Sequence, residues 1–400
     1  MTDTAVQWPA RQERVLSDPL FDPLSEAVLA DPYPAYVRMR DHARVYWHDQ
    51  LNSWVLTGHA ECQEVLRDSD RFGTDFRRIG IATPPTLLSL QTLDPPDHTP
   101  LRHLGLATMR TLDLPAIEAA LSGIATERLG GLLDRGSFDF VADFSDWFTM
   151  AAITAVLGVT PPTEDETFHR LNRELDASMD SGVDAELEGP GLRARQHFNA
   201  LVESWLDDPP PGGAIEYLAE HQQEGGVEKA VLVNSIRAFF HAGFEVPSRF
   251  LGNAVAALIR QPAAMAALLH GAPIDPAVEE LVRFGGPVHA LSRACTQDTT
   301  LGGTPIERGQ IVIAMIGAGD RDPLAFPDPD VLHLDRDPNP HLGFGRGSHS
   351  CLGSMVGRLE ARVVLSVLTS RNALLRLDGE PVVRPSATLR GLRNLPVARA

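Results

Sequence analysis

The long apolar segment from Glu228 to Arg260 constrains the fold of this chain more than any other stretch. Its apolar residues recur at helical spacing, and a single helix of roughly 33 residues would be about 50 Å long at 1.5 Å per residue. Gly243 and Pro247 lie in its middle, on either side of Glu245. Glycine costs about 1 kcal/mol and proline about 3 kcal/mol in a helix interior, relative to alanine. We therefore expect a buried central helix, kinked near Pro247, with a functional reason for its weakened middle.

Helical spacing also dominates the rest of the chain, and strand signals are short and few. The sequence predicts further helices over Pro34 to Met39, Ala60 to Arg67, Leu114 to Leu133, Phe144 to Leu157 and from an Asp275-Pro276 start through Phe284. It predicts strands over Val45 to Trp47 and Ser53 to Thr57, paired as a hairpin, and over Gln310 to Ala314. The expected fold class is mostly α, with small β-sheets to one side.

Composition excludes several classes of protein. The chain has 35 basic and 53 acidic residues among 400, and a net charge of −18 argues against nucleic acid as a partner. Its start is neither cationic nor apolar, and no run approaches the roughly 20 apolar residues of a membrane-spanning helix. Cys62, Cys295 and Cys351 are too scattered for a disulfide framework. We therefore expect a cytoplasmic protein with no secretory signal and no membrane anchor.

The segment from His341 to Gly353 carries the strongest local signal. Gly343, Gly345 and Gly347 would let the backbone turn tightly against something flat and large. Cys351 follows this loop and stands just before an amphipathic helix, whose N-terminus would stabilise a thiolate and lower its pKa. A buried structural cysteine is the ordinary alternative. A phosphate loop is excluded because no Lys-Ser/Thr follows the glycines, and a zinc site because no partner cysteines are near.

The pattern Phe344-x-x-Gly347-x-x-x-Cys351-x-Gly353 resembles the haem-binding signature of the cytochromes P450, the haem-thiolate monooxygenases. Further segments are similar to family motifs and follow in the same order: Asp94 to Arg102, Glu280-x-x-Arg283, Gly319 to Pro323 with Asp320 in place of asparagine, Phe326 to Pro329, and Asn339 to His341. The resemblance covers nearly the whole chain and is closest to soluble bacterial members. It implies one haem domain over residues 1–400, a triangular helical fold with the long central helix over the haem.

The resemblance also implies which residues hold haem b. Cys351 would be the axial thiolate to the iron, between Phe344 and Gly353 of the signature. The residues implied to bind the two haem propionates are His98, Arg102, Arg293 and His349, since a buried dianionic edge needs cations or donors. Glu280 and Arg283 would form a buried structural ion pair, although a surface pair one helical turn apart is the common alternative.

In the family, the central helix carries Ala-Gly-x-Asp/Glu-Thr, and the match here is Ala242-Gly243-Phe244-Glu245-Val246. Gly243 would open space for dioxygen, and Glu245 would deliver protons. The threonine is replaced by Val246, which cannot form a hydrogen bond, so we expect water or a substrate hydroxyl in its place. The replacement also admits oxidative coupling, peroxide-driven oxidation or nitrogen-group transfer, and an inert haem-binding protein or sensor is a further alternative.

By resemblance, the segment 72–93 forms a mobile, apolar roof over the substrate, with walls or plain core from Phe240, Phe244, Val288, Leu291 and Leu392. The expected substrate is a hydrophobic small molecule of secondary metabolism. The expected state is a monomer that receives electrons from ferredoxin and a separate ferredoxin reductase. Three arginines are expected near the thiolate side and would attract the acidic ferredoxin: Arg346, Arg358 and Arg362. Two more could meet an anionic substrate group, although a surface role is favoured: Arg390 and Arg393.

Overall fold

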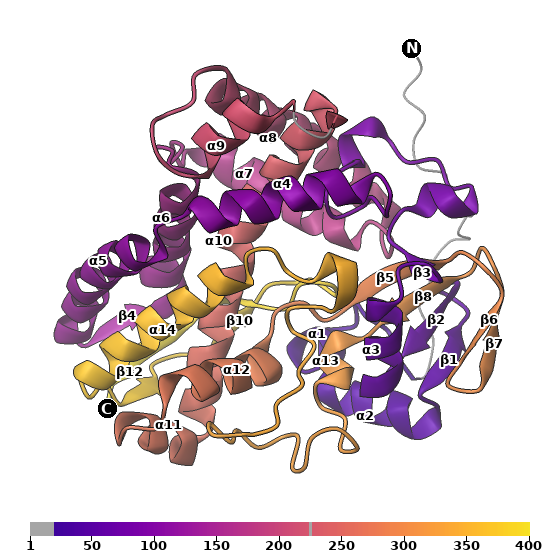
Figure 1. The fold of residues 1–400 in the computed structure, drawn as a ribbon. Helices are drawn as coiled ribbons and strands as arrows, with labels where there is room; N and C mark the ends of the chain where they lie inside the picture. The colour runs from indigo at the N-terminus through magenta and orange to yellow at the C-terminus, as the bar shows by residue number, and fades with distance from the viewer. Residues whose placement is uncertain (1–19, 224–225) are drawn as a thin grey trace.

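The computed structural model describes residues 20–223 and 226–400. The prediction about the N-terminal start therefore lies outside the described residues. The described chain is mostly helical with small sheets, as expected (Figure 1). Its helices are α1 (Glu26–Ala30), α2 (Tyr33–His42), α3 (His59–Arg67), α4 (His98–Thr111), α5 (Leu114–Arg135), α6 (Asp146–Leu157), α7 (Glu166–Ala177), α8 (Glu188–Asp207), α9 (Ala214–His221), α10 (Lys229–Arg260), α11 (Pro262–Leu269), α12 (Ile274–Gly285), α13 (Ile316–Gly319) and α14 (Ser354–Ser370).

Helix α10 is the long central helix that the sequence predicts, and it runs through the middle of the molecule (Figure 1). It packs against α6, α8 and α12, and it continues as one helix through Pro247. Pro247 has no N–H for the carbonyl of Gly243. One carbonyl further on, the Thr149 hydroxyl of α6 donates to the carbonyl oxygen of Phe244 at 2.9 Å. A neighbouring helix therefore supports the backbone beside the proline.

Two apolar cores share α10. One joins the C-terminal half of α10 to α5, α12 and α14, and the other joins its N-terminal half to α4 and α6 to α9. The stretch Phe140–Leu157 is the one helical stretch among the described residues that could cross a membrane by length and composition, and the sequence analysis did not single it out. Because 67% of that stretch is buried inside the protein, it has the surroundings of a core helix.

The largest sheet and the β6–β7 pair lie at one side of the molecule, whereas β4, β10 and β12 lie among the helices away from that side (Figure 1). The largest has the order β1-β2-β8-β5-β3, where β1 (Val45–His48) and β2 (Ser53–Leu56) form the predicted antiparallel hairpin. The other three strands are β8 (Ile311–Ala314), β5 (Leu291–Cys295) and β3 (Phe72–Gly73). The smaller sheets pair β6 (Thr299–Leu301) with β7 (Thr304–Ile306), β10 (Val382–Val383) with β11 (Leu392–Asn394), and β12 (Pro396–Arg399) with β4 (Ser137–Asp139) and β9 (Leu375–Leu377).

Two predicted helix starts are wrong by a few residues. The helix predicted from Phe144 begins as a π-helical turn over Phe140–Ser145, which the Asp139 side chain caps by accepting from two backbone N–H groups, before α6 proper. Helix α12 begins at Ile274 rather than after Asp275. Pro276 still lies in the first turn, where its missing N–H has no partner to lose.

Candidate active site

The glycine-rich loop closes tightly before α14. Gly345 (φ 65°) and Gly347 (φ 73°) have left-handed backbones, which glycine adopts without steric cost. A Cβ on Gly347 would lie 2.7 Å from the carbonyl oxygen of Leu66, so the loop presses directly against α3. The Cys351 N–H donates to the carbonyl oxygen of Phe344 at 2.8 Å. These contacts fix the position of Cys351 at the end of the loop.

The protein around Cys351 affects the ionisation of its thiol. The residue is exposed, yet burial raises the pKa of its thiol. A hydrogen bond from the Gly353 N–H and the charges of Arg102 and Arg358 act in the opposite direction without reversing the shift. The Gly353 N–H at the start of the helix thus acts in the expected direction, but desolvation outweighs it and the net shift of the pKa is upward. A bound metal ion deprotonates a coordinating thiol outright.

The four residues that the resemblance assigns to the propionates come from α4, β5 and the cysteine loop. The rings of His98 and His349 have centroids 4.4 Å apart. Arg102 donates through Nη2 to the Ser350 hydroxyl at 3.2 Å. Arg293 is 6% exposed, and the one contact of its guanidinium within the described chain is with the backbone oxygen of Ser292 at 2.9 Å. Three of the four thus lie together, beside Cys351.

This group of side chains fits an anionic cofactor edge. Nε2 of His98 is buried without a hydrogen-bond partner among the described residues. Burial, followed by the charges of His349 and Arg102, lowers the pKa of His98 to about 4, and burial lowers the pKa of Arg293 to about 10. The nearby carboxylate of Asp94 accepts from His349 at 3.3 Å and from Arg78 at 2.9 Å, and does not pair with Arg102 or Arg293. The excess of buried cations and the unpartnered donor are what the two propionates of haem would satisfy.

One face of α10 turns toward this loop. Phe239, Ala242, Gly243, Val246 and Pro247 are half-buried in an otherwise buried part of the helix, and they fall within an arc of about 140° at 100° per residue. A Cβ on Gly353 would lie 3.6 Å from the Phe239 ring, so this face and the cysteine loop meet.

The structure gives Gly243 a packing reason of its own. A Cβ at this position would lie 2.3 Å from Cδ1 of Ile153 on α6, which is far closer than van der Waals contact. The role of Gly243 in making room for dioxygen stays a prediction. The Ser248 hydroxyl bonds to the Ser145 hydroxyl at 3.2 Å, which places Ser248 against α6. It therefore does not stand in for the missing threonine.

Glu245 is held in a buried ion-pair network that the sequence analysis missed. Its carboxylate, 5% exposed, lies 3.1 Å from Nη1 of Arg384 and 3.5 Å from Nε of Arg249, and it also accepts from Asn172. Burial opposes ionisation, but Arg384 and Arg249 outweigh it and lower the pKa of Glu245. The i,i+4 spacing of Glu245 and Arg249 was a readable signal, whereas Arg384 is 139 residues away and gave none.

A second buried network braces the cysteine loop. Glu280 and Arg283 form the predicted ion pair at 2.7 Å, and both side chains are fully buried. Arg336, which the sequence analysis missed, adds a contact to Glu280 at 3.0 Å. Arg283 also donates to the backbone oxygen of Asp320 at 2.8 Å, and the Asp320 carboxylate accepts from the N–H of Leu342 at 2.7 Å. The ion pair is therefore structural and reaches the loop through Asp320.

Most of the predicted substrate walls are core residues. Phe240 and Phe244 pack in the core with α7 and α8, and Leu392 packs in the other core. Val288 pairs with Leu389, and Arg390 donates to the backbone oxygens of Leu29 and Ala30, which leaves it structural.

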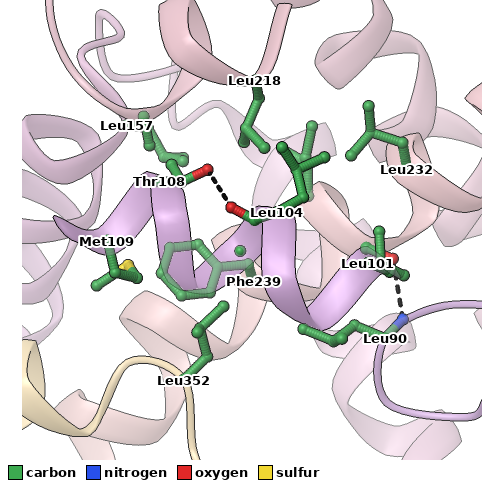
Figure 2. A pocket seen from close by; sticks show the side chains of 14 residues that line it. Leu90, Leu101, Leu104, Thr108, Met109, Leu157, Leu218, Leu232, Phe239 and Leu352 are labelled. Atoms are coloured by element: carbon green, nitrogen blue, oxygen red, sulfur yellow. Dashed lines mark hydrogen bonds between the residues drawn. The ribbon is translucent and has the colours of Figure 1, made fainter. Parts of the chain in front are cut away.

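An apolar pocket does open between α4, α9 and α10, with Leu352 of the cysteine loop at its edge (Figure 2). Of the predicted roof, Leu90 lines this pocket, and its N–H is held by the Ser235 hydroxyl of α10 at 2.9 Å.

Comparison with known proteins agrees with this geometry. The family model for cytochrome P450 matches residues 274–382. Cytochrome P450 CYP107DY1 of Priestia megaterium is 31% identical over 367 residues, which cover 86% of this chain and 89% of that protein. A beta-dihydromenaquinone-9 omega-hydroxylase of Mycobacterium tuberculosis is 29% identical, over 94% of this chain and 78% of that protein. The crystal structure of CYP109E1 from Bacillus megaterium with testosterone has a TM-score of 0.84 at 26% identity, over 94% of this chain and 99% of that one. With the cysteine loop, the cation cluster and the central helix all in place, this chain belongs to the cytochrome P450 family of monooxygenases.

Proposed function

We propose that this cytochrome P450 inserts one oxygen atom from O2 into a hydrophobic small molecule of secondary metabolism, as a single cytoplasmic haem domain. The observation that carries the proposal is the Cys351 loop, which faces the half-buried side of α10 next to an apolar pocket. Two similar proteins support the substrate class: the omega-hydroxylase named above, and unusual P450-like monooxygenases of microbial secondary metabolism, 26% identical to this chain.

The family uses haem b, which with an axial thiolate supplies dioxygen activation and oxygen transfer when bound. In this chain, Cys351 would ligate the iron. His98, Arg102 and His349, which lie together beside that thiol, would hold the propionates, with the buried Arg293 of β5 as a fourth group.

We place Glu245, the neighbour of Val246 in sequence, in the proposed proton path. The carboxylate is ionised and held by Arg384 and Arg249, so it must leave one of these partners before it can accept and pass on a proton. Val246 offers no donor or acceptor. Water at the Gly243 carbonyl, which Pro247 cannot engage, or a hydroxyl of the substrate would complete the path.

A second candidate function is non-standard haem-thiolate chemistry: oxidative coupling, peroxide-driven oxidation or nitrogen-group transfer. The observations that favour it are Val246 in place of the usual threonine and the ion pairs that restrain Glu245.

The two candidates separate in an isotope experiment. The holoenzyme, ferredoxin, ferredoxin reductase and NADH would be incubated under ¹⁸O₂ with a panel of hydrophobic metabolites that shift the Soret band. A product that gains one ¹⁸O atom supports monooxygenation. A product without added oxygen, or turnover with hydrogen peroxide alone, supports the second candidate.

A further inference from the structure

A stripe of polar residues runs along α10 on the side that meets α7 and α8. Asn234, Arg237, His241 and Glu245 fall within an arc of about 80° at 100° per residue. All four are buried, at 2%, 5%, 9% and 5% exposure. Burying so many polar groups on one helix is costly unless each finds a partner.

The two ends of this stripe differ in how their charges are balanced. At the Glu245 end, cations and carboxylates alternate: Arg384 contacts Glu245 and Asp146, and Arg249 contacts Glu245 and Asp176. At the other end lie Arg237 and His241 of α10 and Arg195 of α8, and within the described chain none of these three has a carboxylate oxygen within 4.0 Å. The cationic charge is therefore paired at close range at one end, whereas at the other end carboxylates act only from beyond 4.0 Å, Glu245 on His241 and Glu188 on Arg195.

The side chains of two asparagines, and not a carboxylate, orient Arg237 through a chain of hydrogen bonds. Its Nε donates to Oδ1 of Asn199 at 3.0 Å, and Nδ2 of Asn199 donates to Oδ1 of Asn234 at 2.8 Å. Asn234 in turn donates to the backbone oxygens of Pro85 and Leu88 in the roof segment, both at 2.9 Å. This chain of hydrogen bonds uses Nε and leaves the two terminal nitrogens of the Arg237 guanidinium without a partner among the described residues.

The side chains next to Arg237 also lack partners for their polar atoms. Nε2 of His241 is buried without a partner in the described chain. Burial, and then the charge of Arg195, lowers the pKa of Arg237 to about 9, while burial lowers the pKa of Arg195 to about 10. Burial also lowers the pKa of His241; the negative charge of Glu245 opposes this shift, and the charges of Arg237, Arg195 and Arg249 add to it. The two guanidinium groups of Arg237 and Arg195 repel each other, and a guanidinium fork is well suited to a carboxylate or phosphate.

We propose that Arg237, Arg195 and His241 form a binding site for an anionic group, most simply a carboxylate, on the substrate. The site rests on the proposed function in that the ligand is the molecule to be oxidised. It is separate from the propionate group, because the charges that act on His98 come from His349, Arg102 and Asp94 and not from this cluster.

The position along α10 sets the expected shape of that substrate. Arg237 precedes Ala242 by five residues and Val246 by nine, which is a rise of roughly 8 to 14 Å along the helix. His241 precedes Ala242 in sequence but lies about 100° around the helix from it, so the cluster is on the flank of α10 that meets α8, beside the half-buried face and not on it. We therefore expect an elongated, mainly apolar acid that is oxidised well away from its carboxylate.

The test compares acids with neutral molecules of the same shape. Calorimetric titration of the haem-loaded protein would use straight-chain, aryl and polycyclic carboxylates, each beside its primary alcohol or amide; dodecanoate and dodecanol are one pair. At least one acid should bind tenfold or more tightly than its neutral counterpart, and high salt should weaken it. If no carboxylate of the panel binds more tightly than its counterpart, the proposal is overturned.

Substitutions test which residues cause the preference for acids over their neutral counterparts. Arg237→Gln and Arg195→Gln should each remove the acid preference while leaving binding of the neutral counterpart within about twofold, and Arg237→Lys should retain part of it. Arg193→Gln, on the exposed side of α8, is the matched control and should change nothing. An acid preference that survives in both glutamine variants would overturn the assignment. Because binding is measured without an electron donor, failed oxidation of a tightly bound acid would count against monooxygenation and not against the anion site.

Discussion

At the scale of single residues, the proton path carries the main departure from the family pattern. Glu245 is present and ionised, but Arg249 and Arg384 hold it in an ion-pair network. Arg384 directly follows β10, so this network reaches the β10–β11 pair. Its neighbour Val246 is half-buried on the face that meets the cysteine loop, where a hydroxyl would be expected. The sequence identifies both residues, whereas part of the restraint on Glu245 comes from Arg384, which is 139 residues away in the chain.

Val246→Thr should raise the fraction of NADH electrons that appear in product, because a hydroxyl at this position can hold the water that passes protons. The measurement is product formed per NADH consumed, with Val246→Ala as the control that makes room without adding a hydroxyl. Unchanged coupling in the threonine variant would remove this position from the proton path.

Glu279 gives a pH-dependent prediction. It joins α12 to α14, with Oε1 at 2.6 Å from Nε of Arg358 and Oε2 at 2.9 Å from Nε2 of His341. Although burial opposes them, these partners lower the pKa of Glu279 to about 2 from its ordinary value of 4.5. A carboxylate with a lowered pKa stabilises the fold fully above the unfolded pKa, and this stability is lost as the pH falls from about 5 to about 2.

Glu279→Gln should therefore lower the free energy of unfolding by about 1–2 kcal/mol at pH 7, after allowance for the partial exposure of the pair. The loss should be smaller at pH 4, where the Glu279 carboxyl is already largely protonated in the unfolded chain. Denaturant unfolding at both pH values measures the difference, and Glu118→Gln, whose contact with Arg362 is longer at 3.5 Å, is the control. An equal loss at both pH values would contradict the electrostatic explanation.

At the scale of elements, the meeting of α10 with α6 shows why a helix can need a glycine and tolerate a proline. Ile153 of α6 fills the space that a side chain at position 243 would take. Thr149, one turn earlier on α6, bonds to the carbonyl of Phe244 beside the proline. Helix α6 therefore fits the weakened turn of α10 both in shape and in hydrogen bonding.

Gly243→Ala should destabilise the protein by about 1–3 kcal/mol, because the new methyl group overpacks against Ile153. In the double variant with Ile153→Ala, the two losses should be markedly less than additive, since the second change makes room for the first. Thermal or denaturant unfolding of the two single variants and the double variant measures the coupling. Additive losses would show that Ile153 is not what excludes a side chain at position 243.

At the scale of the whole molecule, the net charge of −18 does not show which individual charges are paired. The three arginines expected near the thiolate side are bonded within the protein. Arg358 pairs with Glu279, Arg362 lies 3.5 Å from Glu118 and 3.6 Å from Asp275, and Arg346 donates to backbone oxygens of the loop. Of the three arginines expected to attract ferredoxin, Arg346 is thus the one without a paired carboxylate among the described residues.

Reduction of the holoenzyme by ferredoxin should still slow as ionic strength rises, but moderately, because two of the three charges are already compensated. Stopped-flow reduction between low and physiological salt measures the effect, and reduction by dithionite is the control that needs no docking. A rate that is indifferent to salt would rule out electrostatic attraction at this surface.

The sequence by itself determined the family motifs, the long central helix, the early hairpin and the buried Glu280–Arg283 pair. Each of these depends on local periodicity or on a short, fixed spacing. Only the tertiary structure decided which charges meet: Arg336 with Glu280, Arg384 with Glu245, and Arg237 with Arg195. It also decided that Phe240 and Phe244 are core. The physical reason is that burial and charge pairing are properties of neighbours in space, and these neighbours are separated by tens to more than a hundred residues in the chain.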